Sequence, residues 1–507
     1  SNIPPTTLTE LEAKELKNSL KLAFPDFIKD YLFKKDGSYR HVPLDISPFK
    51  QLITKYLDLL RENISLIFSE YWPEDAKNEI SFDTLNSYIL NMADELQSTI
   101  NTMHERLLWT INLQNKILKR KIEKGDLERS DERLLKRFDI YVKSLKEHDL
   151  DTYTLNVLSR EGFLPGYGIY EGNIKAFAGR TFTRAWKKLT FELNRQPTIA
   201  IREYAPGNLI YANEGKYRNA YFHLPFQDEQ INPDEYIIDL KNQKIVEKGV
   251  PTPGYASDEL FPLEGIPICD IELMFLSHVS DEESHRFRMQ TYVLGYLQPV
   301  NRGSDEYKLD DHSISHRRGQ MVRLVNVGPT ERVLQGKFGY PICLICGGTR
   351  SPYASEAELE HFTKYHEKIC GYKPGWFALT VDVQVDGILF KNIASQVDAI
   401  NLSEAIKIGA NQVLEMDPED LQILIISHGE DEWDAFLYDT MVGGSGLLDQ
   451  ILKRWHKIIE TAIHILKTCI NSCEKSCYDC MRTYRNCLLY TSPSPRDLST
   501  SRMPSSA

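Results

Sequence analysis

The sequence predicts a multidomain α+β protein with a helical N-terminal region, a mainly β middle domain and a small α/β C-terminal domain. Three observations support this prediction. Apolar residues recur at helical spacing through residues 1–155, short β-type runs separated by Gly/Pro turns fill residues 156–335, and cysteines cluster within residues 336–486. A chain of 507 residues is long enough for about three domains.

Composition narrows the class of protein. Hydrophobic residues make up 42% of the chain and charged residues 26%, and no apolar run reaches the length of a membrane span. The start of the chain lacks the basic and apolar segments of a secretion signal. Nine cysteines, mostly in Cys-x-x-Cys clusters, indicate metal ligation in a reducing compartment, so we expect a cytoplasmic protein without a membrane partner. The net charge of −12 does not exclude a local basic groove for nucleic acid.

The helical region is predicted from three amphipathic stretches. LTELEAKELKNSLKLAF (8–24) has a Thr cap, a longer pattern runs from Asp83 to Lys121, and ERSDERLLKRFDIYVKSLKEH (128–148) resumes it. The basic run KILKRKIEK (116–124) is interpreted as a solvated helix face.

The middle domain begins at a Gly/Pro turn cluster, GFLPGYGIYEGN (162–173). Five β-type runs follow it: TIAIREY (198–204), NLIYAN (208–213), AYFHLPF (220–226), YIIDL (236–240) and KIVEKG (244–249).

Strands and helices alternate in the C-terminal domain, which predicts an α/β unit. Its four segments are FALTVDVQVDGILF (377–390) as paired strands, LSEAIKIGANQVLEM (402–416) as a helix, LQILIISH (421–428) as a buried strand, and residues 443–469 as a turn with one long amphipathic helix.

The first cysteine cluster has the spacing of a zinc finger. Cys343 and Cys346 flank a turn that ends in Gly-Gly, and His366 and Cys370 lie one turn apart on one face of a predicted helix. His361 is the alternative histidine ligand, on another face. The pattern predicts a structural zinc ion, because four protein ligands leave no open position for substrate.

The second cluster places four thiols within twelve residues: Cys469, Cys473, Cys477 and Cys480. A segment this short has no core in which to bury four inert cysteines. Zinc is favoured, and an iron–sulfur cluster is the alternative.

Two further segments are candidates for nucleic-acid contacts. Gly443, Gly444 and Ser445 precede a predicted helix and either contact a phosphate or form a tight packing turn. GRTFTRAWKK (179–188) either contacts DNA or flanks a helix; its basic and aromatic residues are Arg180, Arg184, Trp186, Lys187 and Lys188. The sequence contains no nucleotide P-loop and no catalytic residue that we could identify.

Seven stretches together resemble, in order, the C-terminal half of superfamily 2 DEAD/DEAH-type helicases that bear an MrfA-like zinc-binding (MZB) domain. They are GFLPGYGIY (162–170), IREYAPGNLIYANEGKYR (201–218), HVSDEESHRFRM (278–289), CLICGG with HEKICG (343–371), WFALTVDV (376–383), LYDTMVGGSGLLDQI (437–451) and CEKSCYDCMRTYRN (473–486).

The resemblance implies an accessory, DNA-engaging scaffold region with four-Cys zinc ligation in the terminal domain. In such helicases ATP binds between RecA-like motor lobes, which this chain lacks, so the motor is expected either in the same polypeptide or in a partner subunit. Relatives act in DNA repair and in anti-phage systems of the DISARM and Druantia kind. A stand-alone partner subunit and a zinc-stabilised protein-interaction module remain alternative interpretations.

The end of the sequence is expected to be foreign. CLLYTSPSPRD (487–497) resembles a translated sequencing adapter, and SRMPSSA (501–507) resembles the primer end that follows it. We therefore predict that residues 487–507 are a disordered, non-native tail and exclude Cys487 from the metal ligands.

Overall fold

The computed structural model divides the chain into two compact units, residues 1–172 with 223–230, and residues 173–222 with 231–507. The structure describes residues 10–71, 82–124, 129–148, 152–161, 163, 174–181, 188–224, 232–240, 244–249, 260–279, 287–301, 303–309, 312–417, 420–429, 432–439, 441, 444–469, 477 and 480–481. The turn cluster at 164–173, Cys473, Gly443 and the tail 487–507 lie outside these residues.

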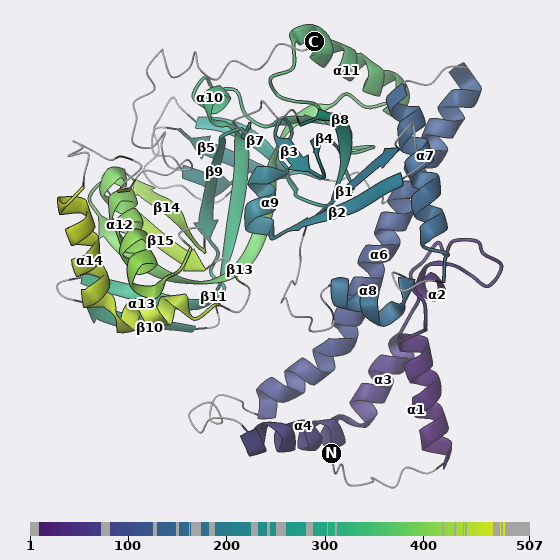
Figure 1. Cartoon of the computed structure of the whole chain (residues 1–507), viewed down its shortest axis with the longest axis horizontal. Helices are drawn as coiled ribbons and strands as arrows, with labels where there is room; N and C mark the ends of the chain where they lie inside the picture. The colour runs from purple at the N-terminus through teal and green to yellow at the C-terminus, as the bar shows by residue number, and fades with distance from the viewer. Residues whose placement is uncertain are drawn as a thin grey trace. The chain divides into compact units, whose positions relative to one another are not determined.

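The first unit is helical, as predicted (Figure 1). Its helices are α1 (Glu10–Ala23), α2 (Lys29–Leu32), α3 (Ser47–Lys55), α4 (Leu57–Tyr71), α6 (Phe82–Lys124), α7 (Arg129–Ser144) and α8 (Thr154–Arg160). Helix α6 is 43 residues long and packs against α2, α3, α4 and α7. Among the described residues, no helix combines the length and the apolar character needed to cross a bilayer.

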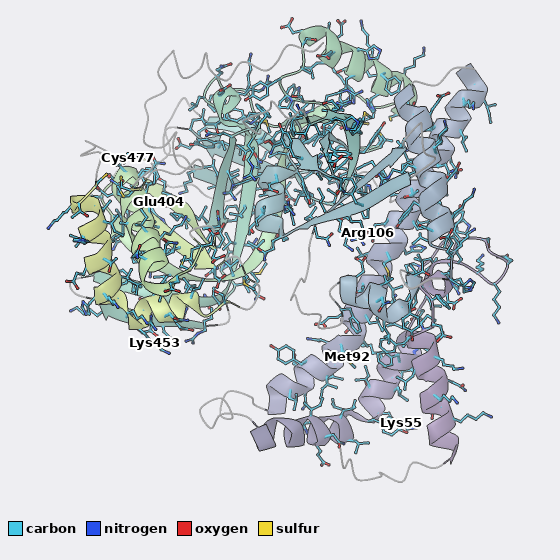
Figure 2. The ribbon with its side chains drawn as sticks, in the orientation of Figure 1. Lys55, Met92, Arg106, Glu404, Lys453 and Cys477 are labelled. Carbon is cyan, nitrogen blue, oxygen red and sulfur yellow. The ribbon has the colours of Figure 1, made fainter. Side chains whose placement is uncertain are left out.

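One face of α6 forms the centre of this unit. Leu96, Ile100 and Leu107 are fully buried at helical spacing. Arg106 on the same helix is one-ninth exposed and forms a 2.6 Å ion pair with Glu161, just beyond α8 (Figure 2). Removal of either side chain would leave the other charge largely buried without its partner, which is destabilising. The ion pair therefore holds α6 and the end of α8 together.

The second unit contains two sheets (Figure 1). Among the described residues, the smaller sheet has five strands in the order β2-β1-β8-β4-β3. They are β1 (Ile174–Thr181), β2 (Lys188–Arg195), β3 (Leu209–Ala212), β4 (Gly215–Phe222) and β8 (Ile271–His278). All neighbours pair antiparallel except β1 and β8.

The larger sheet has ten strands among the described residues, with β10-β11-β13-β7-β5-β6 as its main path. These strands are β5 (Asp234–Asp239), β6 (Lys244–Glu247), β7 (Leu260–Pro267), β10 (Gly303–Leu309), β11 (His312–Pro329) and β13 (Gly375–Ile393). The remaining four pair beside this path: β9 (Thr291–Leu297), β12 (Tyr340–Ile342), β14 (Leu421–Gly429) and β15 (Glu432–Asp439).

Strand β13 corrects one prediction. The segment 377–390 does not form paired strands, because it is the middle of a single 19-residue strand. Asp386-Gly387 continues the strand instead of turning, and Gly387 lies where a Cβ would come within 2.1 Å of the Phe436 ring. The glycine is therefore required for close packing against β15.

Two other predicted elements also differ. TIAIREY (198–204) is not a strand, since α9 (Pro197–Glu203) begins with Pro197 in its first turn and buries Ala200 and Ile201. The predicted long helix after the glycine turn is two helices, α13 (Leu447–Lys453) and α14 (Trp455–Lys467), which meet at Arg454.

The C-terminal part is built around β13, β15 and β14. β15 pairs antiparallel with both of its neighbours, so β13 and β14 run in the same direction with β15 between them. Helix α12 (Gln396–Leu414) connects β13 to β14 and packs against α14 (Figure 1). The predicted helix at 402–416 and strand at 421–428 are therefore confirmed.

The larger sheet takes strands from both sides of residue 335. β11 and β13 pair antiparallel from Ile314 to Asn326, and β13 pairs parallel with β7. The predicted limits of the middle and C-terminal regions therefore do not coincide with the limits of the compact units.

Candidate metal centres

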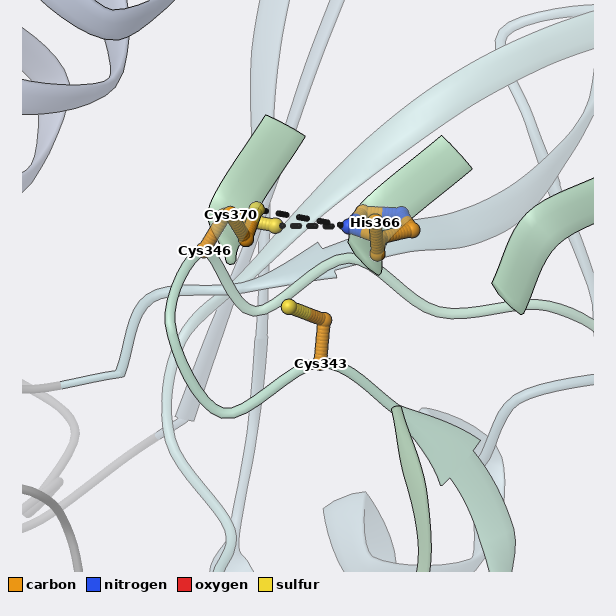
Figure 3. A group of neighbouring side chains, drawn as sticks. All are labelled: Cys343, Cys346, His366 and Cys370. Carbon is orange, nitrogen blue, oxygen red and sulfur yellow. Dashed lines mark hydrogen bonds between the residues drawn. The ribbon is translucent and has the colours of Figure 1, made fainter. Parts of the chain in front are cut away.

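The first cysteine cluster brings together two segments of the second unit. Cys343 and Cys346 lie in a tight turn directly after β12, and His366 and Cys370 lie on the last turns of α11 (Glu356–Cys370). Ser355 starts α11 with a capping box to Glu358, which fixes where the helix presents its ligands. Figure 3 shows the three sulfurs grouped beside the imidazole of His366.

The geometry fits a tetrahedral zinc ion. The four donor atoms all lie within 4.8 Å of one another. His366 Nδ1 is 3.4 Å from Cys346 Sγ and 3.6 Å from Cys370 Sγ. A tetrahedral ion with ordinary Zn–S and Zn–N bonds separates its ligands by about 3.5–3.8 Å. The two printed separations of His366 from the sulfurs therefore match those of a tetrahedral site.

The chemistry of the donor set also suits a cation. Hydrogen bonds from Cys346 and then Cys370 hold the pKa of the Cys343 thiol well below its usual range. The neighbouring sulfurs and burial raise the pKa of Cys346 in turn. Packed thiols that share a proton in this way can all become thiolates only when a positive ion lies among them.

Burial distinguishes the two candidate histidines. His366 is only 4% exposed and faces the sulfurs, whereas His361 lies on the exposed side of α11 and stacks on Tyr365. Only His366 belongs to the group of donor atoms.

The turn that carries Cys343 and Cys346, which we call the knuckle (residues 343–349), is closed by its own backbone. Gly347 N–H donates to the Cys343 carbonyl at 2.8 Å, and Cys343 N–H donates to the Gly348 carbonyl at 2.9 Å. Gly348 N–H points at Cys346 Sγ over 3.4 Å. An N–H donor of this kind stabilises a thiolate and orients it.

The knuckle is also paired with both sheets of the second unit. Phe222 N–H donates to the Gly347 carbonyl at 2.8 Å, and Thr349 N–H donates to the Ala220 carbonyl at 3.0 Å, which joins the knuckle to β4. On its other side the knuckle continues from β12, which pairs with the start of β13. A zinc ion in the knuckle would therefore stabilise a junction between the two sheets.

The second cluster lies just beyond α14. Cys469 Sγ is 3.4 Å from Cys477 Sγ, and Cys477 Sγ is 3.7 Å from Cys480 Sγ. These are again the separations expected between ligands of one tetrahedral ion, about 3.8 Å between sulfurs. Cys473, the predicted fourth ligand, lies outside the described residues. None of the described cysteines forms a disulfide.

The two clusters are thus consistent with two zinc sites. The first cluster offers four donors, which leave no coordination position for substrate and suit a structural role, and the second offers three donors among the described residues.

Ser445, in the glycine turn before α13, has its donors occupied. Ser445 directs both its N–H and its hydroxyl to the buried carboxylate of Asp439. A Cβ on Gly444 would lie 2.6 Å from the Asp386 carboxylate. Two carboxylates around the turn repel a phosphate, which favours the packing turn over a phosphate contact.

The two ends of the candidate DNA-binding segment 179–188 lie on paired strands, and residues 182–187 between them lie outside the described residues. Arg180 is in β1 and Lys188 is in β2, where Thr181 pairs with Lys188. Arg184, Trp186 and Lys187 lie outside the described residues, as do the side chains of Arg180 and Lys188.

The sequence analysis missed a basic surface on α13 and α14. We define this basic face by its exposed side chains, which the run KRWHK signals: Lys453, Arg454, His456, Lys457, His464 and Lys467. Glu460 is the only acid between Lys453 and Lys467, and none of the six side chains forms an ion pair with a described residue.

A comparison with protein-family models identifies the region that contains the second cluster. Residues 402–481 match the model of the MrfA Zn-binding domain, MZB. The chain carries an MZB domain. The matched domain extends from within α12 through the three cysteines Cys469, Cys477 and Cys480. The knuckle lies outside this domain.

A wider similarity extends beyond the MZB domain. The chain is 25% identical over 339 residues to the Druantia protein DruE of Escherichia coli (strain UMEA 4076-1), which covers 57% of this chain and 18% of DruE. The chain thus spans less than a fifth of the length of that relative.

Solved structures of the DUF1998 helicase MrfA are also similar. One has 12% identity and a TM-score of 0.31 over 70% of this chain and 39% of that chain. Another, bound to DNA, has 11% identity and a TM-score of 0.28 over 66% of this chain and 37% of that chain. Scores in this range do not establish a shared overall fold.

Proposed function

We propose that this chain is the zinc-stabilised, DNA-engaging C-terminal region of an ATP-dependent DNA helicase whose motor lobes are supplied outside these residues. The observation that carries the proposal is the MZB match, because it contains a cysteine cluster with zinc geometry. The domain takes its name from MrfA, a helicase that has been crystallised with DNA. The similarity to DruE adds support from residues beyond the domain.

We assign each zinc ion four ligands. Cys343, Cys346, His366 and Cys370 hold the first ion, and Cys469, Cys477 and Cys480, with Cys473, hold the second. The first ion fixes the knuckle between the two sheets, and the second closes the chain after α14. Zinc here supplies folding free energy and no chemistry on a substrate.

The DNA backbone is expected to contact the basic face. On a chain with a net charge of −12, four lysine and arginine side chains with a single intervening acid form a local positive surface. Lys457, His464 and Lys467 share one side of α14 by their spacing, and Lys453 ends α13 (Figure 2). Phosphate contacts of this type are insensitive to base sequence and weaken with salt.

Neutralising the basic face tests this proposal. We expect the triple variant Lys453→Gln/Lys457→Gln/Lys467→Gln to bind single-stranded DNA about tenfold more weakly, with a salt slope smaller by about 2. Fluorescence anisotropy of a labelled oligonucleotide over a series of salt concentrations measures both quantities.

Exposed lysines on α1 supply a control with the same change in charge. The variant Lys14→Gln/Lys17→Gln/Lys21→Gln should bind as the unchanged chain does. Equal losses of DNA affinity in the two variants would show that the effect comes from the change in net charge and not from the basic face. Absence of any salt-sensitive binding by the unchanged chain would favour a protein-interaction module instead.

The source of the motor is a separate question. Fusion to the motor in one polypeptide and docking onto a separate helicase subunit make different genetic predictions. RecA-like motifs encoded in frame and upstream of these residues would support fusion. A start codon close to the codon for Ser1 would support a partner subunit.

A further inference from the structure

Trp376, in the second unit, has an exposed side chain. Among the described residues, Trp109, Trp433 and Trp455 are at most 9% exposed, whereas Trp376 is 38% exposed. Trp376 is the second residue of β13, where it lies opposite Pro341 of β12. Its neighbour Phe377 is buried, so the strand directs one aromatic ring inward and leaves the other at the surface.

An arginine lies against the exposed ring. The guanidinium carbon of Arg332 is 4.7 Å from the centre of the Trp376 ring. Arg332 belongs to α10 (Thr330–Val333) and donates from Nη1 to the Pro352 carbonyl at 2.8 Å. The guanidinium is therefore held in place before any ligand arrives, which lowers the entropic cost of binding.

Two lysines lie near this pair. Lys337 and Lys373 are both exposed, and each lies on a loop that borders Trp376. The loop of Lys337 is close, since a Cβ on Gly339 would lie 3.0 Å from the carbonyl carbon of Trp376. One acid next to Arg332 in the sequence, Glu331, interacts with the hydroxyl of Tyr353.

An exposed aromatic ring with neighbouring cations is typical of surfaces that bind single-stranded nucleic acid. An exposed aromatic ring beside cations accepts the flat face of an unpaired base, and the cations neutralise the phosphates on either side. Duplex DNA does not present such a face, because its bases are stacked on one another. A protein ligand would not require the cations to flank the ring.

We propose that Trp376 and Arg332 form a stacking platform for an unpaired base of single-stranded DNA, with Lys337 and Lys373 contacting the adjoining phosphates. This inference rests on the proposed function and adds a second contact, distant in sequence from the basic face. It predicts that the chain prefers single-stranded over duplex DNA of the same length.

Three substitutions at Trp376 in the full chain test the platform. Trp376→Ala and Trp376→Leu are expected to weaken binding of oligo(dT) about tenfold, while Trp376→Phe keeps a stacking ring and loses less than about threefold. Leucine retains apolar volume against Arg332, so a loss in Trp376→Leu with unchanged zinc content reflects the missing ring. Anisotropy at several salt concentrations is the measurement.

The salt slope separates stacking from phosphate contact. The Trp376 variants should leave the slope unchanged, whereas Lys337→Gln/Lys373→Gln should reduce it by about 1.4. Val397→Ala, an exposed apolar position on α12, is the matched control and should have no effect. Binding by Trp376→Ala and Trp376→Leu equal to that of the unchanged chain overturns the platform and leaves the proposed function intact. No binding by the unchanged chain overturns both.

Discussion

Replacing Gly347 with alanine is expected to detach the knuckle from β4 and to release the first zinc ion. Gly347 has φ +75°, and a Cβ there would lie 1.8 Å from the Phe222 carbonyl oxygen. Backbone atoms cannot move aside as a flexible side chain can, so the knuckle must leave its place beside β4. Left-handed strain and lost pairing together should cost about 3 kcal/mol or more.

Gly371 provides the matched control for this substitution. It follows the ligand Cys370 directly and has a similar φ of +68°, yet nothing lies within 4 Å of a Cβ placed there. Gly371→Ala should therefore cost only about 1 kcal/mol and keep both zinc ions. Zinc content and thermal unfolding measured side by side check the pair. Equal behaviour of the two variants would show that contact with β4 does not support the site.

Replacing Cys346 with serine should remove one of the two zinc ions and loosen the junction between the sheets. A hydroxyl is a poor zinc ligand, and the site then lacks one of its four donors. A ligand present at a thousand times its dissociation constant stabilises a fold by about 4 kcal/mol, so a loss of this order is expected locally.

Amide hydrogen exchange shows which part of the chain loses stability in Cys346→Ser. The amides of Phe222 and Thr349, which pair the knuckle with β4, should exchange faster in Cys346→Ser. The amides that pair β14 with β15 should keep their protection, since both strands lie within the matched region 402–481, which contains the second cluster and not the first. His361→Ala should behave as the unchanged chain does. A loss of zinc in His361→Ala equal to that in Cys346→Ser would contradict the choice of His366.

Local chemistry made the cysteine clusters predictable. Cys343 and Cys346 flank a turn, and His366 and Cys370 lie one turn apart on α11, so short spacings alone assemble each half of the first site. The helices α6, α7 and α12 follow equally from apolar periodicity. These features depend on residues within a few turns of one another.

Non-local pairing could not be predicted in the same way. The attachment of the knuckle to β4 joins residues more than a hundred positions apart, and no spacing in the sequence signals it. The same limit explains β13, where Asp386-Gly387 has the composition of a turn but Gly387 serves the Phe436 ring of β15. The arginine beside Trp376 also comes from a separate element, the helix α10, so the exposed pair is visible only in three dimensions.

The most direct test of two structural zinc ions is a metal count on the purified full chain. Elemental analysis with native mass spectrometry should find two zinc ions per chain, with no iron and no acid-labile sulfide. Cys346→Ser and Cys477→Ser/Cys480→Ser should each lower the count to one, and their combination should lower it to zero. A chain that holds iron and sulfide at the second cluster, or that retains both zinc ions in these variants, would contradict the account.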